Sequence, residues 1–207
     1  IKGKKTFEIK ITVPGKHNIY NALGAISIAE ELKIPIKNIK LGLKNYSGVK
    51  RRFEISHIDK NRDIMIVDDY AHHPNEISET IKAAKNGWNK RIVSIFQPHL
   101  FSRTRDFYKD FAKSLNHADV RIITDIYPAR EKPIKGVSSK NIVNKMKNKN
   151  TYYIKQKNEI AVELKGIIKN NDMILVMGAG DINTIIKDII DMLKHYVWYI
   201  RQNKFEY

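Results

Sequence analysis

Short apolar runs that alternate with helical patterns constrain this chain more than any other feature of its sequence. Four such runs, at residues 64–67, 92–96, 120–124 and 173–177, are short enough to be buried strands. After each of them, apolar side chains recur at helical spacing, and the pattern after the third run predicts a helix near residues 138–147. A short strand at residues 152–154 leads to a further helix expected around residues 160–167. Strands that alternate with helices favour a parallel sheet covered by helices on both faces. We therefore predict an α/β fold with a mostly parallel sheet and helices on both faces.

Polar residues suited to chemistry follow each of these four strands. The segments are DDYAHHP at 68–74, QPH at 97–99, DIYP at 125–128 and GAGD at 178–181. In an open parallel sheet the carboxyl ends of the strands share one edge, where ligands bind. The pattern therefore predicts an enzyme site at that edge.

Length and composition permit a globular domain and exclude several other classes. A chain of 207 residues with 42% hydrophobic content can form one domain, or one domain plus a piece of another. No apolar run approaches the roughly 20 residues that cross a bilayer. The absence of cysteine excludes disulfides and thiolate metal sites, and it is compatible with the cytoplasm. Because the chain starts at Ile1 and shows no signal peptide, we expect it to be part of a longer protein.

The formal charge of +16 leaves two interpretations open. Nucleic acid is one partner for a basic protein. However, the lysines are scattered and no arginine-rich arm is present, which favours a compositional bias or attraction to an anionic ligand. A basic surface also suits nucleotide phosphates.

The first 50 residues differ in pattern from the rest. Residues 5–13 are β-like, residues 17–32 and 36–43 have helical spacing, and residues 48–52 resemble a connector. Asn18 and Asn21 are three residues apart at the start of the first helix, so both amides lie on one face, next to His17. They can contact a base, a ribose or phosphate oxygens, and helix capping by Asn18 is an equally good explanation.

Arginines supply the second group of candidates. Arg52, in the pair Arg51–Arg52, offers a planar fork for phosphate oxygens, although a solvated hinge pair explains the same residues. Arg103 and Arg105 follow the second of these segments, QPH at 97–99, at a helix start, where they can meet a carboxylate or phosphate. For Arg105 an ordinary surface position is an equal alternative.

The cluster at 68–74 is the densest group of chemical side chains. A carboxylate such as Asp69 at a strand end can hold a ribose hydroxyl or a metal-bound water. His72 and His73 are adjacent, which is poor spacing for a closed zinc site, so we predict no metal site. The glycines at 178 and 180 allow close approach to a ligand, but Asn183 breaks the dinucleotide fingerprint, and the chain carries no phosphate-cradling loop.

Six segments together resemble the Mur ligases of bacterial peptidoglycan synthesis. They are GKHNIYNALGA (15–25), GVKRRFE (48–54), DDYAHHPNE (68–76), FQPHLFSRTRDFY (96–108), DIYPARE (125–131) and MGAGDI (177–182). The resemblance implies that residues 1–50 end a central ATPase domain, that residues 51–193 form a Rossmann-like C-terminal domain, and that residues 194–207 are a tail. The UDP-binding domain and the P-loop of the family are absent from the sequence.

The resemblance also implies a reaction and its participants. It is closest to the branch of the family that joins L-alanine to UDP-N-acetylmuramate in the bacterial cytoplasm. ATP converts the muramyl carboxylate to an acyl phosphate, and Mg²⁺ is held mainly by the missing part. The implied ATP-binding residues are His17, Asn18, Asn21, Arg52 and Asp69. The implied substrate-binding residues are Tyr70, His72, His73, His99, Arg103 and Arg105, and the catalytic ones are Arg52, His72 and Arg103.

At two positions this sequence departs from the usual pattern of the family, and two alternative functions stay open. Leu100 and Arg130 stand where relatives usually carry arginine and glycine. The alternatives are the related ligase that recycles murein tripeptide and a non-catalytic basic domain that binds nucleic acid.

Overall fold

The computed structural model describes residues 7–11, 13, 15–46, 48–146 and 149–203, with backbone alone for residues 16, 17 and 195–203. In this part of the chain the strands are β1 (Glu54–Asp59), β2 (Ile64–Asp69), β3 (Arg91–Phe96), β4 (Val120–Ile123), β5 (Thr151–Tyr153) and β6 (Asp172–Met177). The helices are α1 (Lys16–Glu31), α2 (Ile36–Asn45), α3 (Pro74–Gly87), α4 (Phe101–Leu115), α5 (Lys140–Val143), α6 (Ile160–Glu163) and α7 (Ile185–Asn203). Short 3₁₀ turns are η1 (Lys157–Glu159), η2 (Leu164–Gly166) and η3 (Ile182–Thr184).

The strands form one sheet in the order β1-β2-β6-β3-β4-β5. Strand β1 pairs antiparallel with β2, and the other neighbours pair in parallel. The prediction of a mostly parallel sheet with helices on both faces is therefore confirmed. The antiparallel edge strand follows from the short polar turn at residues 60–63, which allows only a hairpin.

Alternation along the buried strands creates two cores, one on each face of the sheet. In β2, Met65 and Val67 face one core, whereas Ile64 and Ile66 face the other, because successive side chains of a strand point to opposite faces. The helical residues that close the first core include Ile77, Ile81, Phe111, Leu115 and Ile142. Those that close the second include Ile160, Leu164, Ile185, Ile189 and Leu193.

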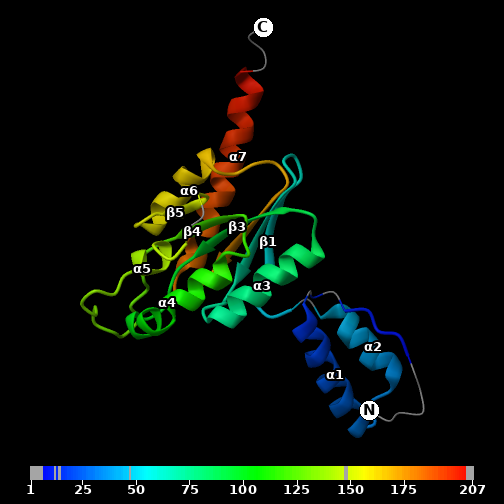
Figure 1. Ribbon diagram of the computed structural model, residues 1–207. Coiled ribbons are helices and arrows are strands. Elements are labelled where there is room, and N and C mark those ends of the chain that lie inside the picture. Colours follow the sequence, from blue (N-terminus) through cyan, green and yellow to red (C-terminus); the bar gives the residue numbers. More distant parts are fainter. Residues whose placement is uncertain (1–6, 12, 14, 47, 147–148, 204–207) are drawn as a thin grey trace.

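This arrangement places a topological switch point at the carboxyl edge of the sheet. Helices α3 and α4, which follow β2 and β3, cover one face, and α7, which follows β6, covers the other (Figure 1). Since β6 lies between β2 and β3, the chain leaves neighbouring strands toward opposite faces. Ligands of open α/β sheets bind at such a switch point.

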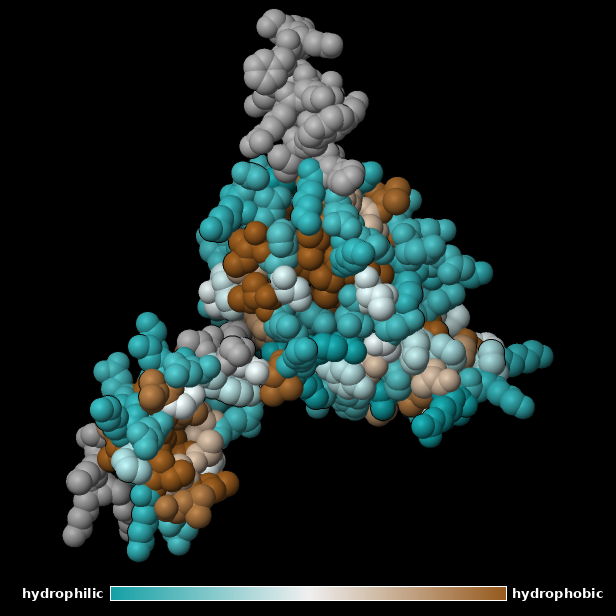
Figure 2. All heavy atoms as spheres, turned by 180° about the vertical axis from the view of Figure 1, so that it is seen from behind, coloured by the Kyte–Doolittle hydropathy of each residue, from teal (hydrophilic) through white to brown (hydrophobic). Residues whose placement is uncertain are grey.

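Helices α1 and α2 form a pair that lies apart from the sheet (Figure 1). Large apolar side chains are exposed on it, as the space-filling view shows (Figure 2). They include Ile19, Leu23, Ile28, Leu32 and Leu41. Both helices agree with the spacing predicted for residues 17–32 and 36–43.

Several local expectations were wrong. The β-like stretch at 5–13 carries no strand in its described residues, because a strand needs a hydrogen-bonded neighbour and the described chain offers none there. The helix expected over 138–147 shortens to α5. The helix expected around residues 160–167 divides into η1, α6 and η2. In contrast, α7 continues beyond residue 193 as far as Asn203.

The turn after β6 depends on close packing at Gly180. A Cβ atom there would lie 2.5 Å from Oε1 of Gln97 and 2.6 Å from Cγ of Tyr127. We expect Gly180→Ala to destabilise the fold by about 1–3 kcal/mol, as overpacking usually does. Gly166→Ala is the matched control because a Cβ at Gly166 meets nothing within 4 Å. Urea denaturation measures both, and equal midpoints for the two variants would contradict this packing.

Candidate functional site

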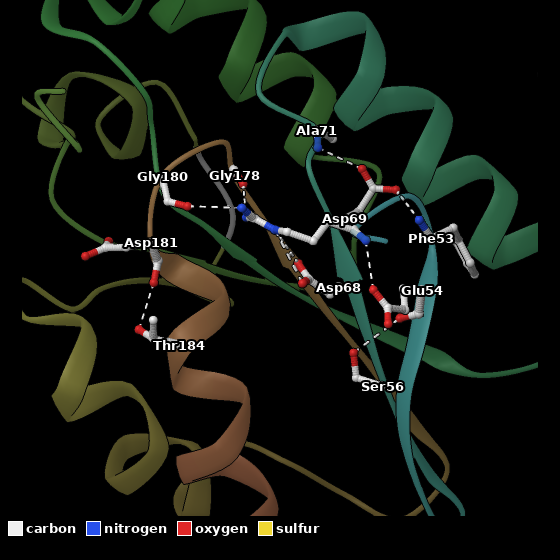
Figure 3. Close-up of polar contacts among 11 residues, drawn as sticks. Phe53, Glu54, Ser56, Asp68, Asp69, Ala71, Gly178, Gly180, Asp181 and Thr184 are labelled. Atoms are coloured by element: carbon white, nitrogen blue, oxygen red, sulfur yellow. Dashed lines mark hydrogen bonds and ion pairs between the residues drawn. The ribbon is translucent and has the colours of Figure 1, made fainter. Parts of the chain in front are cut away.

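Arg51 fastens the segment before β1 to the carboxyl edge of the sheet. Figure 3 shows its contact residues Asp68, Gly178 and Gly180 side by side at this edge. Its Nη2 donates to the carbonyl oxygen of Gly178 at 2.6 Å, and its Nη1 donates to that of Gly180 at 3.3 Å. Its Nε lies 3.4 Å from the carboxylate of Asp68. The guanidinium also lies 4.9 Å from the ring centre of Tyr70. One side chain thereby joins the ends of β2 and β6 to the incoming segment.

Asp69 holds the same segment from the opposite side. Its Oδ2 accepts a hydrogen bond from the Phe53 N–H at 2.8 Å, and its Oδ1 accepts one from the Ala71 N–H at 2.7 Å. Burial raises the pKa of Asp69, although the two N–H groups act in the opposite direction. Arg51 and Phe53 have positive φ angles of 57° and 50°. Non-glycine residues adopt this conformation only where the surroundings enforce it.

Five of the predicted site residues lie in one continuous row beyond this anchor. The Arg52 guanidinium lies 5.6 Å from the ring centre of Tyr70. The rings of Tyr70 and His72 are 5.3 Å apart, and those of His72 and His99 are 6.2 Å apart. Nη1 of Arg103 lies 3.5 Å from Nδ1 of His99. The row brings together two guanidinium groups and two imidazoles, which suits an anionic ligand.

Glu76 lies beneath the row and contacts it at several points. Its Oε2 accepts hydrogen bonds from the N–H groups of His72 at 3.0 Å and His73 at 3.1 Å. The same oxygen is 3.1 Å from Nδ1 of His72, and Oε1 is 3.6 Å from Nη1 of Arg52. A glutamate at the third position of a helix commonly caps it in this way. Here the cap also holds two members of the row.

The surroundings of His99 favour its neutral form. Its ring stacks on Tyr127 with centroids 5.6 Å apart. Burial first, and then the charges of Arg103 and His72, lower the pKa of His99 below its ordinary value of 6.5. A neutral imidazole beside a guanidinium accepts its hydrogen bond and keeps the cation available to a ligand.

The loop after β4 is fixed at two points. Glu131 accepts hydrogen bonds from the Ser102 hydroxyl and from its N–H, the latter at 2.9 Å, so it caps α4. Tyr153 donates its hydroxyl hydrogen to Asp125. Burial, together with this bond, raises the pKa of Tyr153 to about 12. The loop therefore places Tyr127 firmly under His99.

A polar group completes the edge next to β6. Nε2 of Gln97 donates to Oδ1 of Asp181 at 3.0 Å, and Lys157 forms an ion pair with the same carboxylate. Burial acts to raise the pKa of Asp181, but Lys157 and Gln97 outweigh it and the net pKa is lowered. Oε1 of Gln97 is buried without a hydrogen-bond partner among the described residues.

The remaining predicted residues lie outside the row. His73 packs edge-on against Phe107 with centroids 5.0 Å apart. Arg105 is exposed and pairs with Asp106. Asn18 and Asn21 line a separate hollow of about 210 Å³ beside α1, and the side chain of His17 is outside the described residues. Their assigned roles stay predictions.

The sequence interpretation missed Arg51 and Glu76 as residues that shape the site. Glu76 carries a recognisable signal, since a glutamate two residues after Pro74 fits the third position of a helix. Arg51 carries no such signal, because the sequence does not show which of two adjacent arginines faces the sheet and which faces outward. Arg51 is half-buried, whereas the Arg52 side chain is 51% exposed.

Among the described residues no group of three or more histidine, aspartate or glutamate side chains is placed to hold a metal ion. No helix in the described part of the chain has both the length and the apolar character to cross a membrane.

Comparison with known proteins decides the family. Residues 51–180 match the family model described as Mur ligase, glutamate ligase domain, which is more than half of the chain. The chain belongs to the Mur ligase family. This is the family that the six sequence segments resemble.

Individual relatives agree with this membership. The chain is 43% identical over 196 residues to a UDP-N-acetylmuramate–L-alanine ligase from Geotalea uraniireducens, covering 93% of this chain and 42% of the relative. It superimposes on the crystal structure of a UDP-N-acetylmuramate-alanine ligase from Thermotoga maritima with a TM-score of 0.79 and 32% identity, covering 94% of this chain and 41% of that one. A murein peptide ligase from Psychrobacter arcticus shares the fold, with a TM-score of 0.64 and 23% identity over 93% of this chain and 40% of that one. The chain thus spans about two fifths of the length of these relatives.

The Arg51 anchor makes a prediction about stability. Arg51→Ala leaves Asp68 and two carbonyl groups without their partner, so we expect a loss of about 2–4 kcal/mol in the free energy of unfolding. Arg130→Ala is the control, because Arg130 is exposed, and it should stay within about 0.5 kcal/mol of the wild type. Chemical denaturation followed by circular dichroism measures both. Equal stability of Arg51→Ala and wild type would show that the anchor contributes nothing.

Proposed function

We propose that this chain is part of an ATP-dependent ligase that joins L-alanine to UDP-N-acetylmuramate. The observation that carries the proposal is the row from Arg52 to Arg103, found in a chain 43% identical to a ligase named for this reaction. Such a ligase works on peptidoglycan precursors in the cytoplasm of bacteria. The proposed partners are UDP-N-acetylmuramate, L-alanine and ATP.

The proposed chemistry has two steps. A carboxylate oxygen of the muramyl group first takes the terminal phosphoryl group of ATP, which forms an acyl phosphate and releases ADP. The amine nitrogen of alanine then attacks the acyl carbon, and the bond from that carbon to the phosphate oxygen breaks. Negative charge develops on the acyl oxygen and the departing phosphate, so fixed cations nearby lower the barrier.

The row contains such cations, and the surrounding fold holds them in place. Arg52 is the residue that reaches the phosphates, since its side chain is half exposed and held from behind by Glu76. Arg103 and His99 bind a substrate carboxylate, with Tyr70 and His72 between them and Arg52. Asp69 uses both carboxylate oxygens to hold backbone N–H groups, so its contribution to the nucleotide site includes shaping the segment that carries Arg52.

The proposed domain division follows the same comparison. Residues 1–50 end the central ATPase domain, residues 51–193 form the C-terminal domain, and residues 194–207 are a tail. Asn18 and Asn21 contact ATP from the first of these, and domain closure brings the row against the nucleotide. The two ends of the site therefore approach each other only in the closed enzyme.

Mg²⁺ requires residues beyond those described. Magnesium prefers carboxylate, water and phosphate oxygens. The carboxylates of Asp69 and Glu76 are already occupied by N–H groups and cations, and no acidic cluster is present among the described residues. The proposed ligands are therefore ATP itself and residues of the remaining ligase.

The isolated chain should fold without catalysing ligation. It carries no phosphate-cradling loop, so the acyl phosphate cannot form on it. We expect no release of ADP when the chain is mixed with ATP, UDP-N-acetylmuramate and L-alanine. A coupled assay for ADP tests this expectation, and alanine-dependent release of ADP by this chain alone would contradict it.

The row should be essential in the full-length ligase. We expect Arg52→Ala and Arg103→Ala each to depress turnover by about 10²-fold or more, because each removes a cation from developing negative charge. Glu79→Gln serves as the control, since Glu79 is exposed and contacts Lys82. Steady-state kinetics with L-alanine provide the measurement. Wild-type rates in both arginine variants would remove the row from the mechanism.

A further inference from the structure

The hydrogen-bond partners of His72 determine where its ring carries a hydrogen. Nδ1 of His72 lies 3.1 Å from Oε2 of Glu76 and 3.0 Å from the carbonyl oxygen of Tyr70. A carboxylate and a carbonyl only accept hydrogen bonds. Nδ1 must therefore carry the hydrogen, and the other ring nitrogen, Nε2, has the lone pair when the ring is neutral.

Glu76 remains ionised in this position. Burial acts to raise its pKa, but the N–H of His72, the imidazole itself, the N–H of His73 and Arg52 together lower the pKa below the ordinary value of 4.5. The carboxylate is therefore anionic at neutral pH and has no hydrogen to offer Nδ1.

Nε2 of His72 is free to act on a ligand. It has no hydrogen-bond partner among the described residues, and the side chain is 23% exposed at the row. The neighbouring His99 is arranged in the opposite way. Arg103 can only donate to Nδ1 of His99, so that ring carries its hydrogen on Nε2. Of the two imidazoles, His72 is therefore the one that presents a free Nε2 lone pair.

We propose that Glu76 and His72 form a carboxylate–imidazole base that deprotonates the ammonium group of the incoming amino acid. Glu76 is the positioning residue, and Nε2 of His72 is the proton acceptor. An amine nitrogen attacks only after it has lost a proton, and a carboxylate behind an imidazole stabilises the imidazolium that results. The inference rests on the proposed function, since it assigns the base of that reaction.

The proton balance of the step is complete. The ammonium group gives one proton to Nε2 of His72, and the neutral amine forms the bond to the acyl carbon. As the bond to the phosphate oxygen breaks, the second surplus proton of the nitrogen leaves with the phosphate. His72 then returns its proton to solvent, which its exposed edge reaches.

The first test uses the 207-residue chain and does not need ligase activity. Nitrogen-15 NMR of the imidazoles in alkaline buffer, where histidines are neutral, reports which ring nitrogen carries the hydrogen. We expect His72 to carry it on Nδ1, whereas free histidine prefers Nε2. Glu76→Gln keeps an acceptor for the helix cap but loses the charge, so the fraction on Nδ1 should fall, and Glu79→Gln should leave it unchanged. Wild-type His72 with its hydrogen on Nε2 would overturn the proposal.

The second test separates catalysis from structure in the full-length ligase. Hydroxylamine is largely unprotonated at neutral pH, so it attacks an acyl phosphate without help from a base. We expect Glu76→Gln to lower kcat with L-alanine by about tenfold or more, with KM unchanged and with a much smaller loss in hydroxamate formation. Equal losses with both nucleophiles would mean that Glu76 only supports the structure, and the proposal would fail.

The two tests also distinguish this proposal from the proposed function. If the wild-type enzyme does not ligate alanine, the proposed function is wrong and the base role is wrong with it. The NMR result still decides whether Glu76 sets the tautomer of His72 in the chain. If alanine is ligated and His72 has the other tautomer, the base proposal alone is wrong.

Discussion

The guanidinium of Arg51 is the contact on which the site geometry depends. It joins the carbonyl groups of Gly178 and Gly180 to Asp68, and so ties the incoming segment to the ends of β2 and β6. The left-handed backbone at Arg51 then directs the next residue, Arg52, away from the sheet. Arg51 has a structural role. Because Arg51 is held in place, the side chain of Arg52 is available for a ligand.

Carboxylates position the cationic and imidazole groups of this site. Asp69, Glu76 and Glu131 each accept backbone N–H groups at the start of a segment that carries members of the row. A buried or capped carboxylate holds a turn more rigidly than a water molecule does, because its hydrogen bonds are charge-assisted. The result is a rigid set of donors, which is what stabilisation of developing charge requires.

Sequence reasoning found most of the row for a definite physical reason. Carboxyl ends of parallel strands share an edge, so residues after β2 and β3 had to meet even though they are about 25 residues apart in sequence. Sequence reasoning did not find Arg51. The inward direction of its side chain depends on a positive φ angle, which the residue types in this segment do not indicate. Sequence reasoning overestimated the helix near residue 142, where the amphipathic spacing is present but only a short turn packs on the sheet. The described residues of the β-like stretch at 5–13 form no strand, because a strand exists only with a hydrogen-bonded neighbour.

The order of apolar and polar residues was enough to establish an α/β sheet, its two buried faces and the edge where the candidate site lies. These properties depend on periodicity, which is local and can be read along the chain. The direction of individual side chains, in contrast, does not follow from this periodicity. Which of two arginines faces inward, which nitrogen of His72 carries the hydrogen, and whether His73 joins the row or packs on Phe107 depend on atoms brought together from distant segments. Only the folded arrangement decides such contacts, because hydrogen bonds act over about 3 Å and have no counterpart in sequence spacing.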